Sequence, residues 1–344
     1  MELGIGMFGD LQIDSQGKVQ APAQRLKEIL EEIKLMDELG IDFFGIGEHH
    51  RPDYAVSVPE MILAAAAPIT KNIKLGSAVS VLSSSDPVRL FQNFSTLDLL
   101  SEGRAEIMAG RGSFIESFPL FGFNLNDYNQ LFEEKLDLLL KLNQSPKVSW
   151  SGQFRPALHN QEVYPQPYQN GLKVWIAVGG TPESVERAAR LGLPIIFAII
   201  GGSPQQFLPL FDYYKRVYLG HGHDPAKMEI AVHMHSFFGE ESQAIADTYY
   251  PFYAAQMNRI GATRNWPPFS KAQFERGRAQ DGALIIGDAA QSTDKILALI
   301  ETFGLTRFSA HMDVGSPDHQ LMMKSIEIFG DKIIPEIRKH AKEV

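Results

Sequence analysis

Short apolar runs alternate with segments of helical periodicity along nearly the whole chain. Residues 25–39 carry apolar side chains three or four positions apart, and Gly40 follows them. The largely apolar residues 41–46 then predict the next strand. Because glycine in the left-handed conformation ends a helix and lets the chain turn, Gly40 marks a helix-to-strand connection. The same order recurs around Gly192 and Gly304, which indicates repeated helix-to-strand units.

Eight apolar runs qualify as strands and predict an α/β fold. They cover residues 3–8, 41–46, 73–81, 105–109, 174–178, 195–199, 228–235 and 307–311. The helix candidates cover 25–39, 59–67, 87–100, 129–143, 182–191, 204–219, 242–258, 292–303 and 317–339. Apolar strands separated by helices favour a parallel sheet. Eight such units favour closure into a (β/α)8 TIM barrel, with an open doubly wound sheet as the alternative.

Two stretches interrupt this alternation. Residues 144–171 carry several prolines, and residues 259–282 are polar and include four arginines. Irregular segments of this length are usually functional lids or mobile loops. For residues 259–282 two alternatives stay open, namely an active-site or subunit-interface loop and a mobile surface loop. We therefore expect one barrel domain over residues 1–344 with insertions at 144–171 and 259–282.

Composition narrows the class of protein. The chain has 344 residues, of which 44% are hydrophobic and 21% charged, as in ordinary globular proteins. Its net charge of −9 disfavours nucleic acid and anionic membranes as partners. The absence of cysteine excludes disulfides, thiolate metal sites and cysteine nucleophiles. The N-terminus lacks the features of a signal peptide, and no apolar run approaches the ~20 residues of a membrane helix. A cytoplasmic protein is expected.

Two predicted loops share features that suit an anion. Arg111 lies between two glycines directly after the strand at 105–109. Glycines let a ligand approach the backbone, and a guanidinium offers a planar fork for phosphate. The loop after the next strand ends in Thr181-Pro182, where Thr181 is expected to cap a helix whose N-terminus attracts anions. Similar Gly-Ser-Pro loops occur at 202–204 and 315–317. Both Arg111 and Thr181 would lie at the C-terminal mouth of a barrel.

This pair of loops predicts a site for a phosphate-bearing cofactor. An ordinary turn around Arg111 and simple helix capping by Thr181 are the alternatives. The candidate phosphate-binding residues in the two loops are Arg111, Gly112, Ser113, Gly179, Gly180, Thr181 and Ser184. Four aromatic residues after the first loop could be core, a dimer contact or a substrate wall: Phe114, Phe118, Phe121 and Phe123.

Histidines provide the candidate acid–base chemistry. Glu48, His49 and His50 directly follow a predicted strand, which places them at the barrel mouth. A histidine there could move protons near neutral pH, whereas one that only caps the strand end would be structural.

A second set of histidines raises a rival hypothesis. His233 and His235 lie two residues apart on a predicted strand and so face the same side. Together with His49 or His311 they could hold zinc or another divalent ion in a metal-dependent hydrolase. Histidines buried by packing are the commoner explanation, so we predict no metal site.

Together these motifs resemble the bacterial luciferase-like monooxygenase family, and its non-luminous flavin-dependent members most of all. The resemblance runs in order over nearly the whole chain, through residues 47–50, 75–79, 86–89, 97–104, 110–112, 179–184, 188–194 and 312–335. It implies a (β/α)8 barrel with insertions, often a homodimer, that binds reduced FMN at the C-terminal mouth. Luciferases carry a cysteine where Gly110 stands, so the resemblance extends to flavin binding and not to light emission.

The resemblance also implies roles for individual residues. His49 falls at the flavin's reactive edge as the acid–base residue, and Glu48 is expected to orient it. Ala78 and Val79 fall at a non-proline cis peptide beneath the flavin ring. The residues of the phosphate loops fall at the family's phosphate contacts: Arg111, Gly112, Ser113, Gly180, Thr181 and Ser184.

The implied reaction is the oxidation of a small organic substrate by reduced FMN and oxygen. Electrons are expected from NAD(P)H through a separate flavin reductase. Three alternatives stay open: a deazaflavin-dependent oxidoreductase that uses the same mouth, the metal-dependent hydrolase, and a flavin-binding protein without turnover. The organic substrate is not identified by the sequence.

Overall fold

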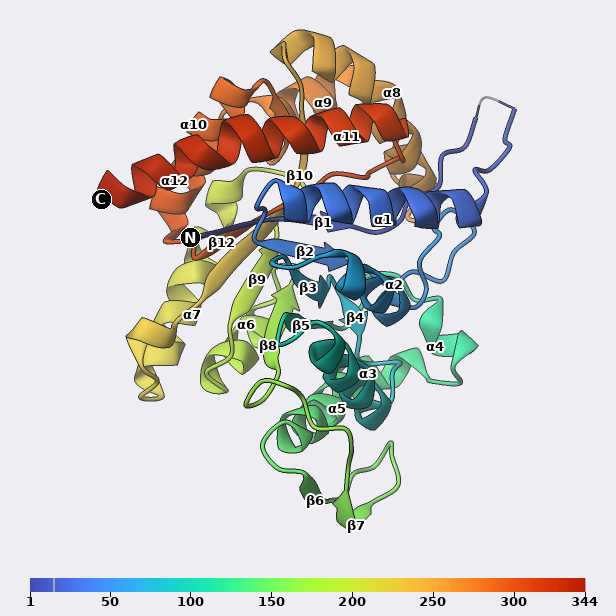
Figure 1. Cartoon of the computed structure of the whole chain (residues 1–344), viewed down its shortest axis with the longest axis vertical. Helices are drawn as coiled ribbons and strands as arrows, with labels where there is room; N and C mark the ends of the chain where they lie inside the picture. The colour runs from blue at the N-terminus through green and yellow to red at the C-terminus, as the bar shows by residue number, and fades with distance from the viewer. Residues whose placement is uncertain (15, 344) are drawn as a thin grey trace.

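A computed structural model describes residues 1–14 and 16–343. Eight parallel strands form a closed ring in chain order (Figure 1). They are β1 (Glu2–Met7), β2 (Phe43–Ile46), β3 (Lys74–Ser77), β5 (Ala105–Gly110), β8 (Lys173–Val178), β9 (Ile195–Ala198), β10 (Ile230–Phe238) and β12 (Arg307–His311). Pairing of β1 with β12 closes the ring, which confirms the barrel over the open sheet.

Helices cover the outside of the barrel. The principal ones are α1 (Pro22–Glu38), α2 (Pro59–Ala66), α3 (Pro87–Leu100), α5 (Tyr128–Leu142), α6 (Pro182–Arg190), α7 (Leu208–Gly220), α8 (Ser242–Ala262), α10 (Ala289–Phe303) and α11 (His319–Ile328). Gly40, Gly192 and Gly304 have φ values of 68°, 65° and 67°. The left-handed turns predicted between helix and strand are therefore confirmed at all three glycines.

Charged and aromatic side chains fill the barrel at the end where the strands begin. The fully buried Arg307 guanidinium lies between Phe43 and Trp175, 4.3 and 4.4 Å from their ring centroids. Its Nη1 is 2.8 Å from Glu106 Oε2, and Arg307 also pairs with Glu2. Trp175 Nε1 donates to the same Glu106 oxygen at 3.1 Å. A network of ion pairs therefore closes this end of the barrel interior.

The structure corrects several predicted boundaries. The strand predicted at 73–81 is two pieces, β3 and β4 (Ser80–Val81), on either side of a cis peptide between Ala78 and Val79. The helix predicted at 317–339 is divided by a π-helical turn, Phe329–Ile333, before α12 (Ile334–Glu343). Gly330 lies in that turn, where a Cβ would come within 2.8 Å of Leu39. The short strand β11 (Ile285–Gly287), which pairs with β10, was not predicted.

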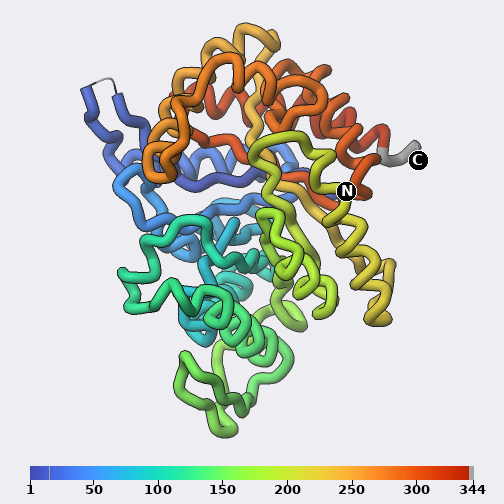
Figure 2. The backbone as a smooth tube through the Cα atoms, turned by 180° about the vertical axis from the view of Figure 1, so that it is seen from behind, coloured from blue at the N-terminus to red at the C-terminus, as the bar shows by residue number. Residues whose placement is uncertain are grey.

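The two insertions differ from each other. The first holds an antiparallel hairpin, β6 (Lys147–Trp150) and β7 (Leu158–Glu162), which projects from the barrel in both views (Figure 1 and Figure 2). The expectation of an irregular 259–282 was wrong in part. Its first residues continue α8, and α9 (Lys271–Arg278) begins at a capping box formed by Ser270 and Gln273. In the described part of the chain, every helix is too short or too polar to cross a bilayer.

Candidate active site

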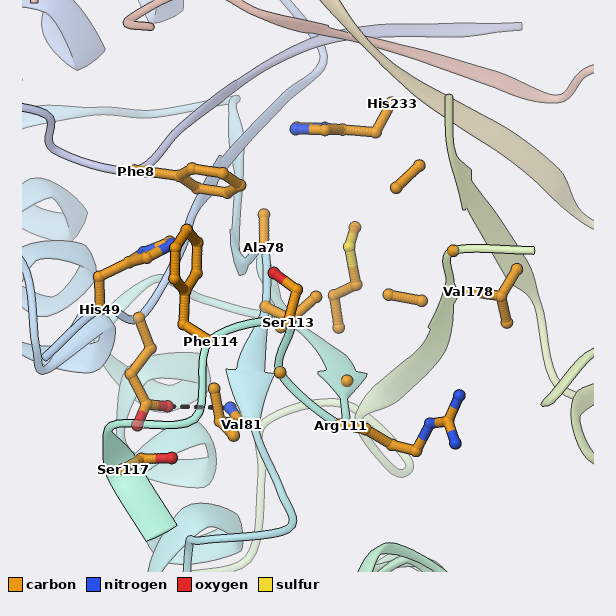
Figure 3. Close-up of a pocket in the computed structure, with 18 of the residues that line it drawn as sticks. Phe8, His49, Ala78, Val81, Arg111, Ser113, Phe114, Ser117, Val178 and His233 are labelled. Atoms are coloured by element: carbon orange, nitrogen blue, oxygen red, sulfur yellow. Dashed lines mark hydrogen bonds between the residues drawn. The ribbon is translucent and has the colours of Figure 1, made fainter. Parts of the chain in front are cut away.

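A cavity of about 290 Å³ opens at the end of the barrel where the strands finish. Its wall includes nine of the predicted site residues, namely Glu48, His49, Ala78, Val79, Arg111, Gly112, Ser113, Gly179 and Thr181. Gly180 and Ser184, which were also predicted, do not line it. Figure 3 shows His49, Phe8 and Phe114 on one side of the cavity and Arg111 on the other. The cavity therefore has an aromatic end and a cationic end.

His49 is enclosed by aromatic rings at the first of these ends. Its imidazole lies 4.2 Å from the Tyr54 ring, nearly parallel to it, and 4.5 Å from the Phe8 ring, measured between centroids. Phe114 meets it edge-on at 5.1 Å. The Nδ1 atom is buried and has no hydrogen-bond partner among the described residues. Burial lowers the pKa of His49 to about 3, so this imidazole is neutral at pH 7.

The prediction that Glu48 orients His49 is wrong. One carboxylate oxygen of Glu48 lies 2.8 Å from His50 Nε2. The other accepts a hydrogen bond from the Val81 amide at 2.9 Å, the contact drawn as a dashed line in Figure 3. Glu48 therefore fixes the segment that follows the cis peptide and holds His50 beside it. Adjacent residues beyond a strand point in different directions, which is why the carboxylate reaches His50 and not His49.

Glycines bring the backbone close to the floor of the cavity. At Gly110 a Cβ would lie 2.7 Å from Val79 Cγ2, and at Gly112, where φ is +78°, it would lie 2.9 Å from Val81 Cγ1. The cis peptide at Ala78–Val79 that the resemblance implied is present. A cysteine at position 110 would clash with Val79 in this arrangement. The packing of Val79 thus explains the glycine at this position.

Arg111 organises the cationic end. Its Nη1 donates to Asn129 Oδ1 at 2.6 Å, and its Nη2 donates to Thr181 Oγ1 at 3.3 Å. Tyr128 lies under the guanidinium, 5.1 Å from the ring centroid, and donates its hydroxyl to the Gly112 carbonyl at 2.6 Å. These contacts hold the guanidinium at the edge of the cavity beside the start of α6.

The predicted cap of α6 does not form. The Thr181 side chain makes no hydrogen bond to the first turn of the helix and instead accepts one from Arg111. Ser184, in that first turn, is 3% exposed, and its Oγ has no partner among the described residues. Gly180 has a φ of +112°, a conformation that side chains rarely adopt. The N-terminus of α6 therefore has the Thr181 hydroxyl at the cavity edge and the Ser184 hydroxyl without a partner in its first turn, where the helix dipole favours an anion.

Sequence reasoning missed part of the aromatic wall. Phe8 reaches the cavity because buried Asp313 accepts hydrogen bonds from the amides of Phe8 and Gly9, at 2.9 and 2.7 Å. Tyr54 stacks on His49 from the loop after β2. The local sequence around Phe8 and Tyr54 does not distinguish them from ordinary core residues, because the contacts that place them come from distant segments.

The four phenylalanines at 114–123 occupy different environments in the structure. Phe114 lines the cavity, whereas Phe118 is completely buried beside it. Phe121 is 51% exposed, and Phe123 lies under the Lys135 ammonium, 3.7 Å from it. Only Phe114 of these four residues belongs to the cavity wall.

The strand histidines pack together inside the barrel. His233 lines the cavity; its Nδ1 lies 3.0 Å from Ser309 Oγ, and its Nε2 has no described partner. His235 Nδ1 lies 2.9 Å from the Tyr253 hydroxyl. The rings of His233 and His235 both lie near the His311 ring. Burial lowers the pKa of His233 to about 4 and that of His235 to about 3. Within residues 1–14 and 16–343, no three His, Asp or Glu side chains are grouped to hold a metal ion.

Comparison with known proteins identifies the family. The sequence profile of the luciferase-like monooxygenases matches residues 1–320. This chain therefore belongs to the luciferase-like monooxygenase family and is an oxidoreductase of small molecules. A curated relative is the alkanal monooxygenase alpha chain of the Kryptophanaron alfredi symbiont. It is 28% identical over 216 residues, which cover 61% of this chain and 60% of the relative.

Two solved structures share the fold. One is the oxygenating constituent of 3,6-diketocamphane monooxygenase from Pseudomonas putida, in complex with FMN. Its TM-score is 0.76 at 19% identity, over 98% of this chain and 99% of that one. The other is an F420-dependent secondary alcohol dehydrogenase in complex with an F420-acetone adduct. Its TM-score is 0.74 at 18% identity, over 98% of this chain and 100% of that one. At these identities the likeness concerns the fold alone.

Proposed function

We propose that this chain is an FMN-dependent monooxygenase that uses reduced flavin and oxygen to oxidise a small organic molecule. One observation carries the proposal: the cavity has Arg111 and Thr181 at one end, the imidazole of His49 at the other, and apolar side chains between them. FMN has the matching order of groups, namely a phosphate, a flexible chain and a flat ring with a polar edge. The donors at the cationic end suit the phosphate, and the apolar wall suits the ring.

The residues present fit such a cofactor. Arg111 and Thr181 would hold the phosphate, together with the backbone of Gly112 and Ser113 and the first turn of α6. Ser184 Oγ, buried and without a described partner, supports this fit because a buried hydroxyl normally has an acceptor or donor nearby. Ala78 and Val79 would lie beneath the ring. Reduced FMN, when bound, supplies the electrons and the means to activate oxygen.

His49 is the acid–base candidate at the aromatic end. Because its imidazole is neutral at pH 7, one ring nitrogen carries a proton and the other can accept one. His49 lines the cavity, so its imidazole can exchange a hydrogen bond or a proton with a ligand there. Phe8, Tyr54 and Phe114 exclude water around it, which limits loss of the oxidising power to solvent. Glu48 acts indirectly, by holding the segment around Val81.

The proposal extends to the partners. Electrons would come from NAD(P)H through a separate flavin reductase, and the chain would act as a homodimer. The substrate is a small organic molecule that reaches the aromatic end of the cavity.

Two experiments on the purified protein test the proposal. In an anaerobic titration with reduced FMN and with reduced F420, we expect saturable binding of FMN. In a separate aerobic assay with reduced FMN and a panel of aldehydes and ketones, we expect oxygen uptake that depends on the added compound. Stronger binding of F420 without oxygen uptake would overturn it in favour of a hydride-transferring deazaflavin enzyme. FMN binding with no compound-dependent oxygen uptake would indicate a flavin-binding protein without turnover.

A further inference from the structure

Polar side chains gather in one part of the cavity wall, on the His49 side and away from Arg111 (Figure 3). We call this part of the wall the polar corner, and its residues are Glu48, His50, Glu116 and Ser117. The first two belong to the loop after β2, and the last two belong to the segment after β5. None of these four side chains is needed to hold FMN in the proposed function. The polar corner is therefore available to the second ligand of the reaction, the organic substrate.

Contacts between the two segments hold the polar corner together. The Phe121 ring meets the His50 ring edge-on, with 5.2 Å between their centroids. Arg51 Nη1 donates to Glu116 Oε1 at 3.2 Å, and Arg51 Nε donates to Asp53 Oδ1 at 3.0 Å. Arg51 is not itself part of the cavity wall, so it supports the polar corner from behind.

Glu48 determines which ring nitrogen of His50 is left for a ligand. Glu48 Oε1 lies 2.8 Å from His50 Nε2, and a carboxylate oxygen accepts, so we assign the ring proton to Nε2. In the neutral imidazole the other nitrogen, Nδ1, is then an acceptor. Nδ1 of His50 is neither buried nor hydrogen-bonded to a described residue, in contrast to the buried Nδ1 of His49. His50 therefore presents a hydrogen-bond acceptor at the cavity wall.

Ser117 adds a hydroxyl group that has no partner within the fold. The residue is 3% exposed, and its Oγ makes no hydrogen bond to the part of the chain that the structure describes. Figure 3 shows this hydroxyl on the His49 side, turned toward the interior of the cavity. A buried hydroxyl normally has a hydrogen-bond partner, which makes a ligand the expected partner here. Rotation about one bond moves the oxygen among three staggered positions, so it can follow a ligand in the cavity.

Acceptors outnumber donors in the polar corner. His50 Nδ1 and Glu116 Oε2 are acceptors, and the second of these is buried without a described partner. Both oxygens of Glu48 are also acceptors and already hold His50 and the Val81 amide. Ser117 can accept and supplies one donor. Such a set suits an uncharged ligand group that donates a hydrogen bond, as a hydroxyl does. A ligand carboxylate would be repelled by the carboxylates of Glu48 and Glu116.

We propose that the polar corner binds a hydroxyl group of the organic substrate, and that this substrate is a hydroxylated aromatic compound. The substrate hydroxyl donates to His50 Nδ1 and accepts from Ser117 Oγ. The aromatic ring is held by Phe114, which lines the cavity two residues before Glu116 and offers a flat apolar surface. This inference rests on the proposed function, because the compound is the substrate of that oxidation.

Paired ligand titrations of the FMN-loaded protein test the inference. The probes are para-ethylphenol, para-ethyltoluene and para-ethylbenzoate, which share one ring and differ in a hydroxyl, methyl or carboxylate group. Equilibrium dialysis measures each affinity. We expect para-ethylphenol to bind about tenfold more tightly than para-ethyltoluene, because the methyl group leaves the polar groups of the wall unpaired. Para-ethylbenzoate should bind more weakly than para-ethylphenol.

Two variants remove the partners of the substrate hydroxyl one at a time. Ser117→Ala should lower the ratio of para-ethylphenol affinity to para-ethyltoluene affinity about tenfold. His50→Gln should lower the same ratio, since glutamine keeps a donor for Glu48 near Nε2 and lacks the acceptor at Nδ1. Ser95→Ala is the matched control. Ser95 is likewise buried with an unpartnered Oγ among the described residues, but it lies on α3 outside the cavity wall, so the ratio should not change.

Nitrogen NMR of the labelled imidazoles gives a readout that does not depend on affinity. Without ligand, His50 should carry its proton on Nε2. Para-ethylphenol should shift the Nδ1 resonance of His50, because Nδ1 accepts a hydrogen bond, and para-ethyltoluene should leave it in place. A proton on Nδ1 in the neutral ring would overturn the inference, because that nitrogen could then not accept.

Distinct outcomes separate this inference from the proposed function. Equal affinities for para-ethylphenol and para-ethyltoluene, or tighter binding of para-ethylbenzoate, would overturn the inference. So would the same affinity ratio in Ser117→Ala and Ser95→Ala. If the unaltered protein does not bind FMN, the proposed function fails, and titration of the protein alone still tests the polar corner. If FMN binds and the two uncharged probes are not distinguished, only the inference fails.

Discussion

The two ends of the barrel treat their polar groups in opposite ways. Where the strands begin, Arg307, Glu106, Glu2 and Lys74 pair with one another inside the fold. Where the strands finish, nitrogens of His49, His233 and His311 and the hydroxyls of Ser80 and Ser184 are buried and have no hydrogen-bond partner among the described residues. Buried polar groups normally have partners, so groups left without them indicate where a ligand completes the set. We therefore assign a stabilising role to the first end and the proposed cofactor site to the second.

Among the substitutions that test this comparison, the removal of Arg307 is expected to have the largest effect on stability. Arg307→Met leaves the buried Glu106 with only the half-exposed Lys74, 3.5 Å away, as a countercharge, so the free energy of unfolding should fall by about 3–5 kcal/mol. FMN affinity should be unchanged, because Arg307 lies at the opposite end from the cavity. Urea unfolding at pH 7 and FMN titration measure the two quantities.

The exposed pair between Arg338 and Asp42 is the matched control. Arg338→Met should cost at most about 1 kcal/mol, because surface ion pairs contribute little. Equal losses in Arg307→Met and Arg338→Met would mean that the closed end does not stabilise the barrel as described.

The two ends of the barrel should lose their contributions to stability in different pH ranges as pH falls. The pKa of His235 is about 3 in the folded protein, against an ordinary value of 6.5, so below pH 6.5 the unfolded state binds the extra proton. Stability is therefore lost as pH falls, by about 1.4 kcal/mol per pH unit for each such histidine. His235→Gln should reduce this slope by that amount between pH 5.5 and 4, as measured by urea unfolding at several pH values.

The closed end responds in a lower pH window. Burial alone would raise the pKa of Glu2, but Arg307 and Lys74 outweigh it and lower that pKa to about 2. Its stabilising contribution is thus complete above about pH 4.5 and is lost only as pH falls toward 2. Burial raises the pKa of Asp10, so its protonation favours the folded state as pH falls and opposes the effect of the histidines. The quantity to compare is therefore the difference in pH slope between His235→Gln and the unaltered protein, in which the Asp10 contribution cancels. An unchanged slope would show that His235 is charged in the folded state.

His49 should affect turnover and not folding. His49→Gln keeps a polar side chain but removes the acid–base nitrogen, so kcat should fall on the order of 10²-fold. The midpoint of thermal unfolding should change little, because glutamine keeps a polar side chain of similar size at this position. A variant with full oxygen-uptake activity would remove His49 from the proposed chemistry.

Thr181 should show the smallest of these effects. Thr181→Val keeps the shape of the side chain and removes its hydroxyl, which is expected to lower FMN affinity about tenfold. Helix α6 should be unaffected, because the Thr181 side chain does not cap it. Riboflavin affinity is the control, and its loss in parallel would indicate a general distortion of the mouth.

Periodicity predicted the barrel because each unit repeats the same local pattern. Apolar strand, helix and left-handed glycine are visible in the sequence at Gly40, Gly192 and Gly304, and the parallel order follows from them. The predicted strand order also placed Arg111 and Thr181 close to each other, because they follow neighbouring strands. Short elements such as β11 and α9 were missed, since three strand residues or a polar eight-residue helix carry little periodic signal.

The candidate site was less predictable because side-chain partners depend on distant segments. The carboxylate of Glu48 was expected at His49 and instead binds His50 and the Val81 amide. Phe8 enters the cavity through its backbone contact with Asp313, which lies 305 residues away in the chain. The hydroxyl of Thr181 was expected to cap α6 and accepts from Arg111. No local pattern distinguishes these arrangements from ordinary caps and core.

A crystal structure of the protein with bound FMN tests the central claim most directly. The phosphate should lie within hydrogen-bonding distance of the Arg111 guanidinium and Thr181 Oγ1, with the flavin ring over Ala78 and Val79 and its edge near His49. A phosphate bound elsewhere, with Arg111 still bonded to Asn129 and Thr181, would contradict the proposed division between a stabilising end and a cofactor-binding end.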